Sequence, residues 1–240
     1  MTNVNTNALK LFAQQTRSKL VSSIKTKMQW VLTEDSAELR GKQNEINQLR
    51  KEIAEKSQNN ENGEEKVIEE VAYTWFNRVM ALRFMDANGY NIPMVITPGE
   101  GLIRPEILQE AMGGNADEAL QLTADDLQHD EEFLYKKLLL AVCNHYNQSM
   151  PFLFESISDY TELLLPDDLL SEQSFVTDIR KGMTDEDCQN VEIMGWLYQF
   201  YITERKADAE AKKSQKGGLK SDEQLLPPSF SPHTGLFATW

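Results

Sequence analysis

Residues 64–89 (EEKVIEEVAYTWFNRVMALRFMDANG) decide the fold, because they read as one helix that must be buried on almost every side. Glutamates fill the first turns, where the positive end of a helix dipole stabilises carboxylates. Apolar residues then recur around nearly the whole circumference, and Gly89 suits the left-handed position that follows a helix. Arg78 and Arg83 lie on this rod and need acidic or carbonyl partners there. The stretch therefore predicts a central core helix.

Two further helices are expected before the central one. Thr6 or Asn7 is a good N-cap for an amphipathic first helix. Residues 36–56 give a second helix with a thin apolar seam, which indicates half of a helical hairpin. The tract 57–63 (SQNNENG) is a polar linker. Residues 1–56 thus read as a unit of basic N-terminal helices.

Five cations lie on the polar face of the first helix: Lys10, Arg17, Lys19, Lys25 and Lys27. They have no acidic neighbour nearby in sequence, since the first acidic residue of the chain is Glu34. One interpretation is the solvated face of an ordinary helix, which is what charge runs usually are. The other is a positive stripe that contacts DNA phosphates. Both interpretations stay open, and the second predicts weak, salt-sensitive DNA binding.

Negative charge is concentrated in the middle of the chain. Within a total of −14, the net charge is +3 for residues 1–62, −18 for residues 63–203 and +1 for residues 204–240. Residues 64–211 therefore read as an acidic helical domain, and residues 212–226 (KKSQKGGLKSDEQLL) as a flexible basic linker. The predicted fold class is mainly α.

The cysteine content and the length of the apolar runs indicate the cellular compartment. Cys143 and Cys188 are no disulfide framework, although one bond between them would be allowed, and they fit a reducing environment. The longest apolar runs, such as residues 138–142, fall far short of a membrane span. No signal peptide is recognisable. We expect a cytoplasmic protein with no membrane partner.

No arrangement of residues predicts catalysis or metal binding. A nucleophile elbow and a glycine-rich phosphate loop are both missing from the sequence. His129, Cys143 and His145 do not complete a four-ligand metal set, and Cys143 and His145 point apart on one helix. Carboxylate pairs occur by chance in so acidic a segment. We therefore expect no catalytic, cofactor-binding or metal-ligating residue in this chain.

Four aromatic-rich blocks carry a resemblance to a known family. In their order and spacing they resemble the N-terminal region of the PglX family, the adenine-specific DNA methyltransferases of type 1 bacteriophage-exclusion (BREX) systems. The resemblance covers roughly residues 6–225. The blocks are residues 71–90 (VAYTWFNRVMALRFMDANGY), 141–155 (AVCNHYNQSMPFLFE), 159–170 (DYTELLLPDDLL) and 191–206 (VEIMGWLYQFYITERK).

The resemblance implies a longer enzyme, in which this helical region precedes an α/β domain that binds S-adenosylmethionine and methylates adenine at N6. Such an enzyme holds a flipped adenine with an Asn-Pro-Pro-Tyr type motif. Neither this motif nor a cofactor loop occurs here, so the chain lacks the α/β methyltransferase domain and is expected to be inactive alone. The implied partners are DNA, other BREX defence proteins and the missing methyltransferase domain.

Residues 227–240 (PPSFSPHTGLFATW) are apolar, uncharged and without helical or strand period. In the family, the basic linker is followed by a segment resembling QLFTPHWIVRY that enters the methyltransferase domain. One set of codons for residues 227–240, read two bases later, encodes SQLFTPHWIVRYM. The expectation is an out-of-frame tail, produced by a frameshift near Leu226.

Two alternatives come from other functional classes. The first is a stand-alone acidic protein that mimics DNA, because spaced carboxylates can imitate phosphates electrostatically. The second is a protein-interaction module that reassembles with a separately encoded remainder of the enzyme. The basic first helix counts against the first alternative.

The frameshift makes a prediction about the locus. Sequencing is expected to find, downstream of the codon for Leu226 and in the shifted phase, an open frame that encodes a methyltransferase domain. If no such frame exists there, the frameshift explanation fails. An in-phase start codon downstream would instead favour the reassembling module.

Overall fold

The structure is a computed structural model that describes residues 5–57, 62–115, 120, 122–123, 125–151, 153–154 and 159–215. The predicted tail at 227–240 and most of the predicted linker at 212–226 lie outside these residues. Every regular element that is described is helical, and the strand-like contact within these residues is an isolated bridge between Pro98 and Pro105. The predicted mainly α class is therefore confirmed.

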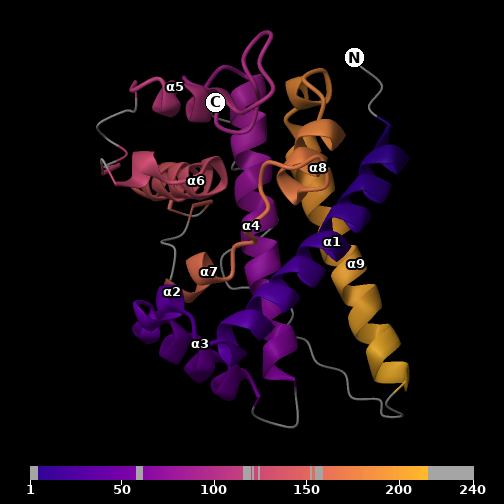
Figure 1. Cartoon of the computed structure of the whole chain (residues 1–240). Coiled ribbons are helices and arrows are strands. Elements are labelled where there is room, and N and C mark those ends of the chain that lie inside the picture. The colour runs from indigo at the N-terminus through magenta and orange to yellow at the C-terminus, as the bar shows by residue number, and fades with distance from the viewer. Residues whose placement is uncertain are drawn as a thin grey trace.

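Helix α4 (Gly63–Ala87) stands at the centre of the molecule (Figure 1). Helices α1 (Thr6–Thr33), α3 (Gln43–Lys56), α8 (Phe175–Gly182) and α9 (Glu192–Gln215) all pack against it. Its side chains are buried around the whole circumference, from Val67 and Trp75 to Phe76 and Leu82. Gly89 follows its C-terminus with a φ of 70°. The helix predicted from residues 64–89 is confirmed.

The N-terminal helices belong to the same core as the rest. Helix α1 begins after Asn5, whose side chain accepts from the amide of Ala8, and it crosses in front of α4 toward α3 (Figure 1). One apolar cluster runs from Leu9 through α4 to Ile202 on α9. The predicted unit at 1–56 and the predicted domain at 64–211 therefore share one hydrophobic core.

The predicted helix at 36–56 is divided in two. Helix α2 (Ala37–Arg40) starts at the N-cap Ser36, and α3 follows after Gly41 and Lys42. Apolar periodicity continues through the break, because Leu39 on α2 and Leu49 on α3 are both buried. Periodicity alone therefore could not reveal it. Helix α3 then packs on α4, which gives the predicted helical hairpin.

In the second half of the chain, α5 (Glu106–Met112) and α6 (Glu131–Asn147) lie beside the upper part of α4 (Figure 1). These two helices pack on each other, and the short α7 (Asp159–Leu163) lies on α3. The 3-10 turns η3 (Asp126–Gln128) and η4 (Asp187–Gln189) connect them to their neighbours. Just before η4, the Thr184 hydroxyl donates to the Asp187 carboxylate and accepts from the Asp187 amide.

Substitution of two glycines, Gly63 and Gly195, tests how closely α3 and α4 approach each other. A Cβ at Gly63 would meet the carbonyl oxygen of Ile53, so Gly63→Ala is expected to lower the free energy of unfolding by about 2 kcal/mol. A Cβ at Gly195, inside α9, would meet nothing within 4 Å. Gly195→Ala is therefore expected to stabilise by up to about 1 kcal/mol, since alanine favours helices. Urea unfolding measures both, and equal effects would contradict this close approach of α3 to α4.

Candidate interaction surfaces

Arg17, one of the five predicted DNA-contacting cations, is buried in an ion-pair network. It is 3% exposed, and its guanidinium donates to both carboxylate oxygens of Glu69 at 2.7 and 2.9 Å and to Asp208 at 2.5 Å. The guanidinium also lies 5.5 Å from the ring centre of Tyr201. Arg17 thus joins α1 to α4 and α9, which is a structural role.

Lys27 and Lys19 also have acidic partners. The Lys27 ammonium lies 2.5 Å from Asp167 and 4.3 Å from the Trp30 ring centre, and the residue is 8% exposed. Lys19 pairs with Asp178 at 2.5 Å and donates to a backbone carbonyl of residue 173. Lys27 and Lys19 thereby join α1 to the 163–175 loop and to α8.

Lys10 and Lys25 are the two predicted cations whose side chains are exposed. They lie fifteen positions apart on α1, which is about 22 Å along a helix. The five cations therefore do not present one continuous stripe to solvent. Whether the exposed pair contacts DNA stays a prediction.

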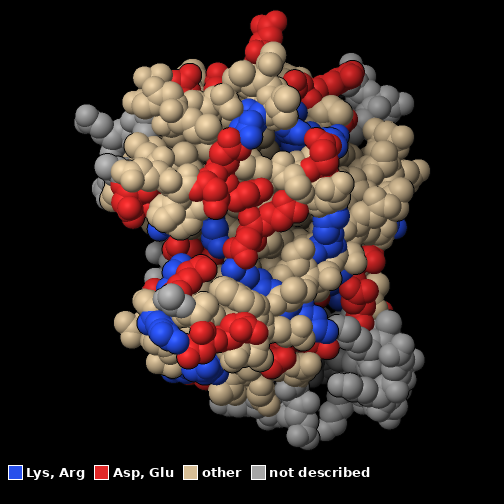
Figure 2. Space-filling view, viewed as in Figure 1, with Lys and Arg blue, Asp and Glu red and all other residues tan. Residues whose placement is uncertain are grey.

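Asp167 is shared by two lysines. Its second oxygen lies 3.2 Å from the ammonium of Lys136 on α6, so one carboxylate bridges α1 and α6. Burial acts to raise the pKa of the Asp167 carboxyl, but the two ammonium groups hold it below its ordinary value. Figure 2 shows a central group of Asp and Glu side chains on one face of the molecule, with Lys and Arg side chains around it.

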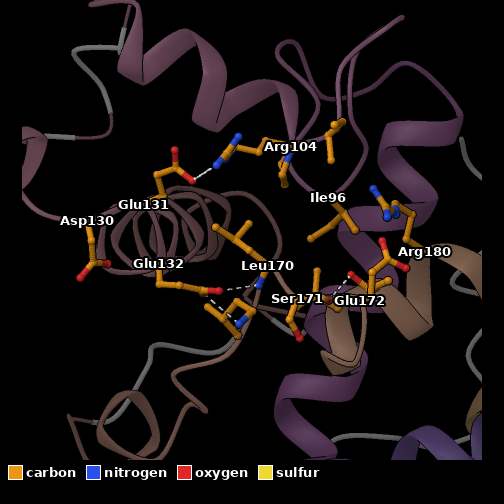
Figure 3. Close-up of a pocket in the computed structure, with 14 residues that line it drawn as sticks. Ile96, Arg104, Asp130, Glu131, Glu132, Leu170, Ser171, Glu172 and Arg180 are labelled. Carbon is orange, nitrogen blue, oxygen red and sulfur yellow. Dashed lines mark hydrogen bonds and ion pairs between the residues drawn. The ribbon is translucent and has the colours of Figure 1, made fainter.

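A cleft of about 650 Å³ opens between α6, α8 and the turn at 98–105 (Figure 3). Its apolar residues are Ile96, Ile103, Pro105, Leu169, Leu170 and Val176. Its polar residues are Arg104, Asp130, Glu131, Glu132, Ser171, Glu172, Thr177 and Arg180. No local sequence pattern predicts this site, because its walls come from segments far apart in the chain.

The four carboxylates of the cleft are already engaged. Glu131 pairs with Arg104 and Glu172 pairs with Lys181. Asp130 caps α6 by accepting from the amide of residue 133, and Glu132 accepts from the amides of residues 169 and 170 at 3.0 and 3.1 Å. Burial raises the pKa of the Glu132 carboxyl, against the opposing effect of those two amides. The carboxylates therefore fix the walls of the cleft, and this arrangement does not resemble a general acid and base poised for a substrate.

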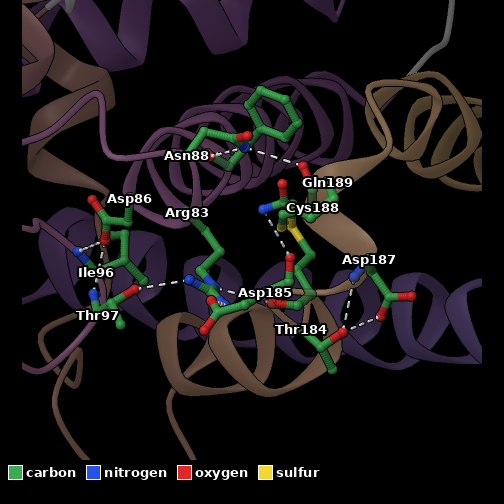
Figure 4. A network of polar contacts seen from close by, with 12 residues as sticks. Arg83, Asp86, Asn88, Ile96, Thr97, Thr184, Asp185, Asp187, Cys188 and Gln189 are labelled. Atoms are coloured by element: carbon green, nitrogen blue, oxygen red, sulfur yellow. Dashed lines mark hydrogen bonds and ion pairs between the residues drawn. The ribbon is translucent and has the colours of Figure 1, made fainter. Parts of the chain in front are cut away.

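The wall that carries Ile96 is held by a buried carboxylate, Asp86 (Figure 4). Asp86 is 4% exposed and accepts from the amides of Val95, Ile96 and Thr97 at 2.7 to 2.9 Å, and from the Asn91 side chain at 2.6 Å. Burial raises the pKa of this carboxyl, although all four donors act to lower it. The Asp86 carboxylate thus fixes the loop after α4 through hydrogen bonds to three backbone amides and one side-chain amide.

Arg83 fixes the same loop from the other side. It donates to Thr97 at 3.0 Å, to the carbonyl of Met183 at 3.0 Å and to Asp185 at 2.5 Å (Figure 4). The predicted need of Arg83 for acidic and carbonyl partners is confirmed. Arg78 lies 5.2 Å from the ring centre of Trp75, a contact that the sequence did not predict.

Cysteine and histidine residues form no reactive centre in the described part of the chain. Cys143 and Cys188 are buried free thiols, and burial raises their pKa values to about 12 and about 11. Such thiols are almost entirely protonated at neutral pH and are poor nucleophiles. Among the residues that the structure describes, no group of three or more His, Cys, Asp or Glu could hold a metal ion. Nor does this part contain a helix of the length and apolarity that crossing a bilayer requires.

Comparison with curated proteins gives two similar sequences. The chain is 35% identical over 179 residues to the adenine-specific methyltransferase BrxX of Escherichia coli O9:H4 (strain HS), covering 71% of this chain and 15% of that protein. It is also 35% identical over 264 aligned positions to the adenine-specific methyltransferase PglX of Lacticaseibacillus casei (strain Zhang), covering 94% of this chain and 22% of that protein. The chain thus spans about a fifth or less of the length of these relatives. No protein-family model matches it.

The structural role of Arg17 predicts a loss of stability on substitution. Arg17→Met leaves Glu69 partly buried without its bidentate partner, and we expect the free energy of unfolding to fall by about 3 kcal/mol. Lys25→Met, at an exposed position of the same helix, is expected to change it by less than about 0.5 kcal/mol. Urea unfolding at neutral pH measures both. Equal stability of the two variants would return Arg17 to the set of ligand-contacting cations.

Proposed function

Because the chain is a relative of the PglX and BrxX adenine-specific methyltransferases over most of its own length, we propose that it forms a helical, non-catalytic region of such an enzyme. The parent enzyme would transfer a methyl group from S-adenosylmethionine to N6 of adenine in DNA. In this proposal the chain is the N-terminal part of the enzyme and is inactive alone. S-adenosylmethionine binds to the rest of the enzyme.

One observation carries this proposal: similarity extends along 94% of this chain yet covers 22% of the longer relative. A second supports it, since the described residues are mainly helical and the cleft carboxylates are engaged in caps, backbone contacts and ion pairs. Transfer to a base requires a pocket that holds the flipped adenine against the methyl donor. That chemistry is therefore assigned to the remainder of the relatives' length.

We propose DNA, other BREX defence proteins and the catalytic remainder as partners of the parent enzyme, acting in the cytoplasm. The reduced state of Cys143 and Cys188 is consistent with a reducing compartment. For DNA, Lys10 and Lys25 are the candidates left exposed on α1, while Arg17, Lys19 and Lys27 serve packing as well.

A second candidate function is an acidic interaction module. The observation that favours it is the group of Asp and Glu side chains in the centre of the face in Figure 2, together with three α1 cations that are neutralised by acids. Spaced carboxylates of this kind could imitate DNA. Inhibition of a nucleic-acid-binding enzyme by the isolated chain, relieved by salt, would favour this candidate over a region that contacts DNA.

The leading proposal predicts that the chain transfers no methyl group by itself. Purified chain, labelled S-adenosylmethionine and adenine-unmethylated duplex DNA are expected to give incorporation no higher than a protein-free blank. Calorimetric titration with S-adenosylmethionine is expected to show no binding. Full-length L. casei PglX is the positive control for the assay. Methyl transfer that depends on the chain alone would refute the non-catalytic assignment.

A further inference from the structure

We propose that the cleft between α6, α8 and the 98–105 turn is the docking surface for the catalytic remainder of a full-length PglX-type chain. This inference rests on the proposed function and names the partner surface. The occupant is a protein surface with an apolar side chain at its centre and basic residues around it. Four observations support the assignment: the exposed apolar lip of the cleft, its preformed walls, the charge of its rim and the length of the relatives outside the matched region.

The lip of the cleft exposes large apolar side chains. Ile103 is 85% exposed and lines the cleft, and Leu102 beside it is 43% exposed. Behind this lip, Ile96, Leu169 and Val176 form the floor of the cleft, with 1 to 3% of their surface exposed. Single exposed apolar residues are ordinary, but an exposed pair that continues into an apolar cleft is typical of interaction sites.

The shape of the cleft is fixed before any partner arrives. Asp86 holds the backbone around Ile96 through three amide hydrogen bonds, and Arg83 ties Thr97 to the segment after α8. Glu132 holds the opposite wall through two further amides. A preformed site avoids the entropy cost of ordering loops on binding. The buried polar groups thus hold the floor of the cleft at Ile96 in one geometry beneath the exposed lip at Leu102 and Ile103.

The volume suits side chains of a partner protein. A cleft of about 650 Å³ falls within the range in which pockets bury a compact ligand, and it is large enough for an aromatic or aliphatic anchor with its neighbours. Buried anchors of this kind carry most of the binding energy of protein interfaces. The apolar lining therefore selects an apolar anchor.

The charge of the rim selects basic neighbours for that anchor. Four carboxylates and two guanidinium groups line the cleft, and it lies on an acidic part of the chain. A second copy of this chain would bring the same acidic face and be repelled. A basic surface would gain from the field of Asp130 and Glu172, both exposed at the rim.

The relatives supply an occupant of the right size. They carry at least three-quarters of their length outside the matched region. In Figure 1 the cleft elements lie toward the upper end of α4, while α9 ends near its lower end. The 25 residues of α4 span about 37 Å, and a 300-residue domain has a radius of gyration of about 19 Å. A catalytic domain of that size is large enough to follow the C-terminal end of α9 and also to contact the cleft near the upper end of α4.

Hydrogen exchange tests the docking with proteins as they exist. Amide exchange is measured by mass spectrometry in this chain and in full-length L. casei PglX, with intrinsic rates corrected for sequence. We expect exchange in the turn aligned with residues 98–105 to be at least tenfold slower in the full-length relative. The control is the exposed segment around Asp35, between α1 and α2, which is expected to exchange at the same corrected rate in both proteins.

Equal rates at the 98–105 turn would overturn the proposal. The basic character of the occupant is tested by raising salt from about 0.05 M to about 0.5 M, which should weaken the protection of the 98–105 turn. Protection that does not depend on salt would overturn the basic character of the occupant.

Sedimentation of this chain and of its Ile103→Asp variant tests whether a second copy of the chain occupies the cleft. A monomer is expected for both, and a dimer that the substitution dissolves would overturn the assigned occupant. Methyl transfer is measured separately, so failure of docking and failure of the non-catalytic assignment are distinguishable.

Discussion

The burial of α4 on all sides is the constraint on which the rest of the structure depends. A helix with apolar residues around its whole circumference cannot face water on any side. Helices α1, α3, α8 and α9 therefore each cover part of it, and its upper end is enclosed by the loop that Asp86 and Arg83 hold. The hydrophobic effect assembles these elements, since it scales with apolar area and has no direction. The position of each partner is then set by a few polar contacts.

Those polar contacts join the basic first helix to the acidic remainder of the chain. Arg17 meets Glu69 and Asp208, at separations of 52 and 191 residues in sequence. Lys27 meets Asp167 across 140 residues. The opposite charges of the two segments are thus complementary within one domain. The cost of burying Arg17 is offset because its charge and most of its donors are paired.

This arrangement explains how far the sequence could be read. Local signals predicted the presence of α1 and α4 and the end of α4 at Gly89, because apolar periodicity and capping are properties of neighbouring residues. The predicted N-cap of α1 at Thr6 or Asn7 was wrong, since Asn5 caps the helix. The break before α3 was missed, since the apolar seam continues through it. The burial of Arg17 and Lys27 was missed for another reason. Their partners are distant in sequence, and no local pattern announces a pairing of that kind.

The cleft illustrates the same limit and bears on function. Nothing in residues 95–97 or 168–172 suggests that they form opposite walls of one site, because each wall is held by a carboxylate from another helix. Asp86 and Glu132 accept hydrogen bonds from backbone amides. Of the rim carboxylates, Glu131 pairs with Arg104, Glu172 pairs with Lys181, and Asp130 caps α6. A catalytic carboxylate must instead keep an oxygen for its substrate. Groups used in this way make a rigid surface, and a rigid surface loses little entropy on binding, which is the physical basis of the proposed docking.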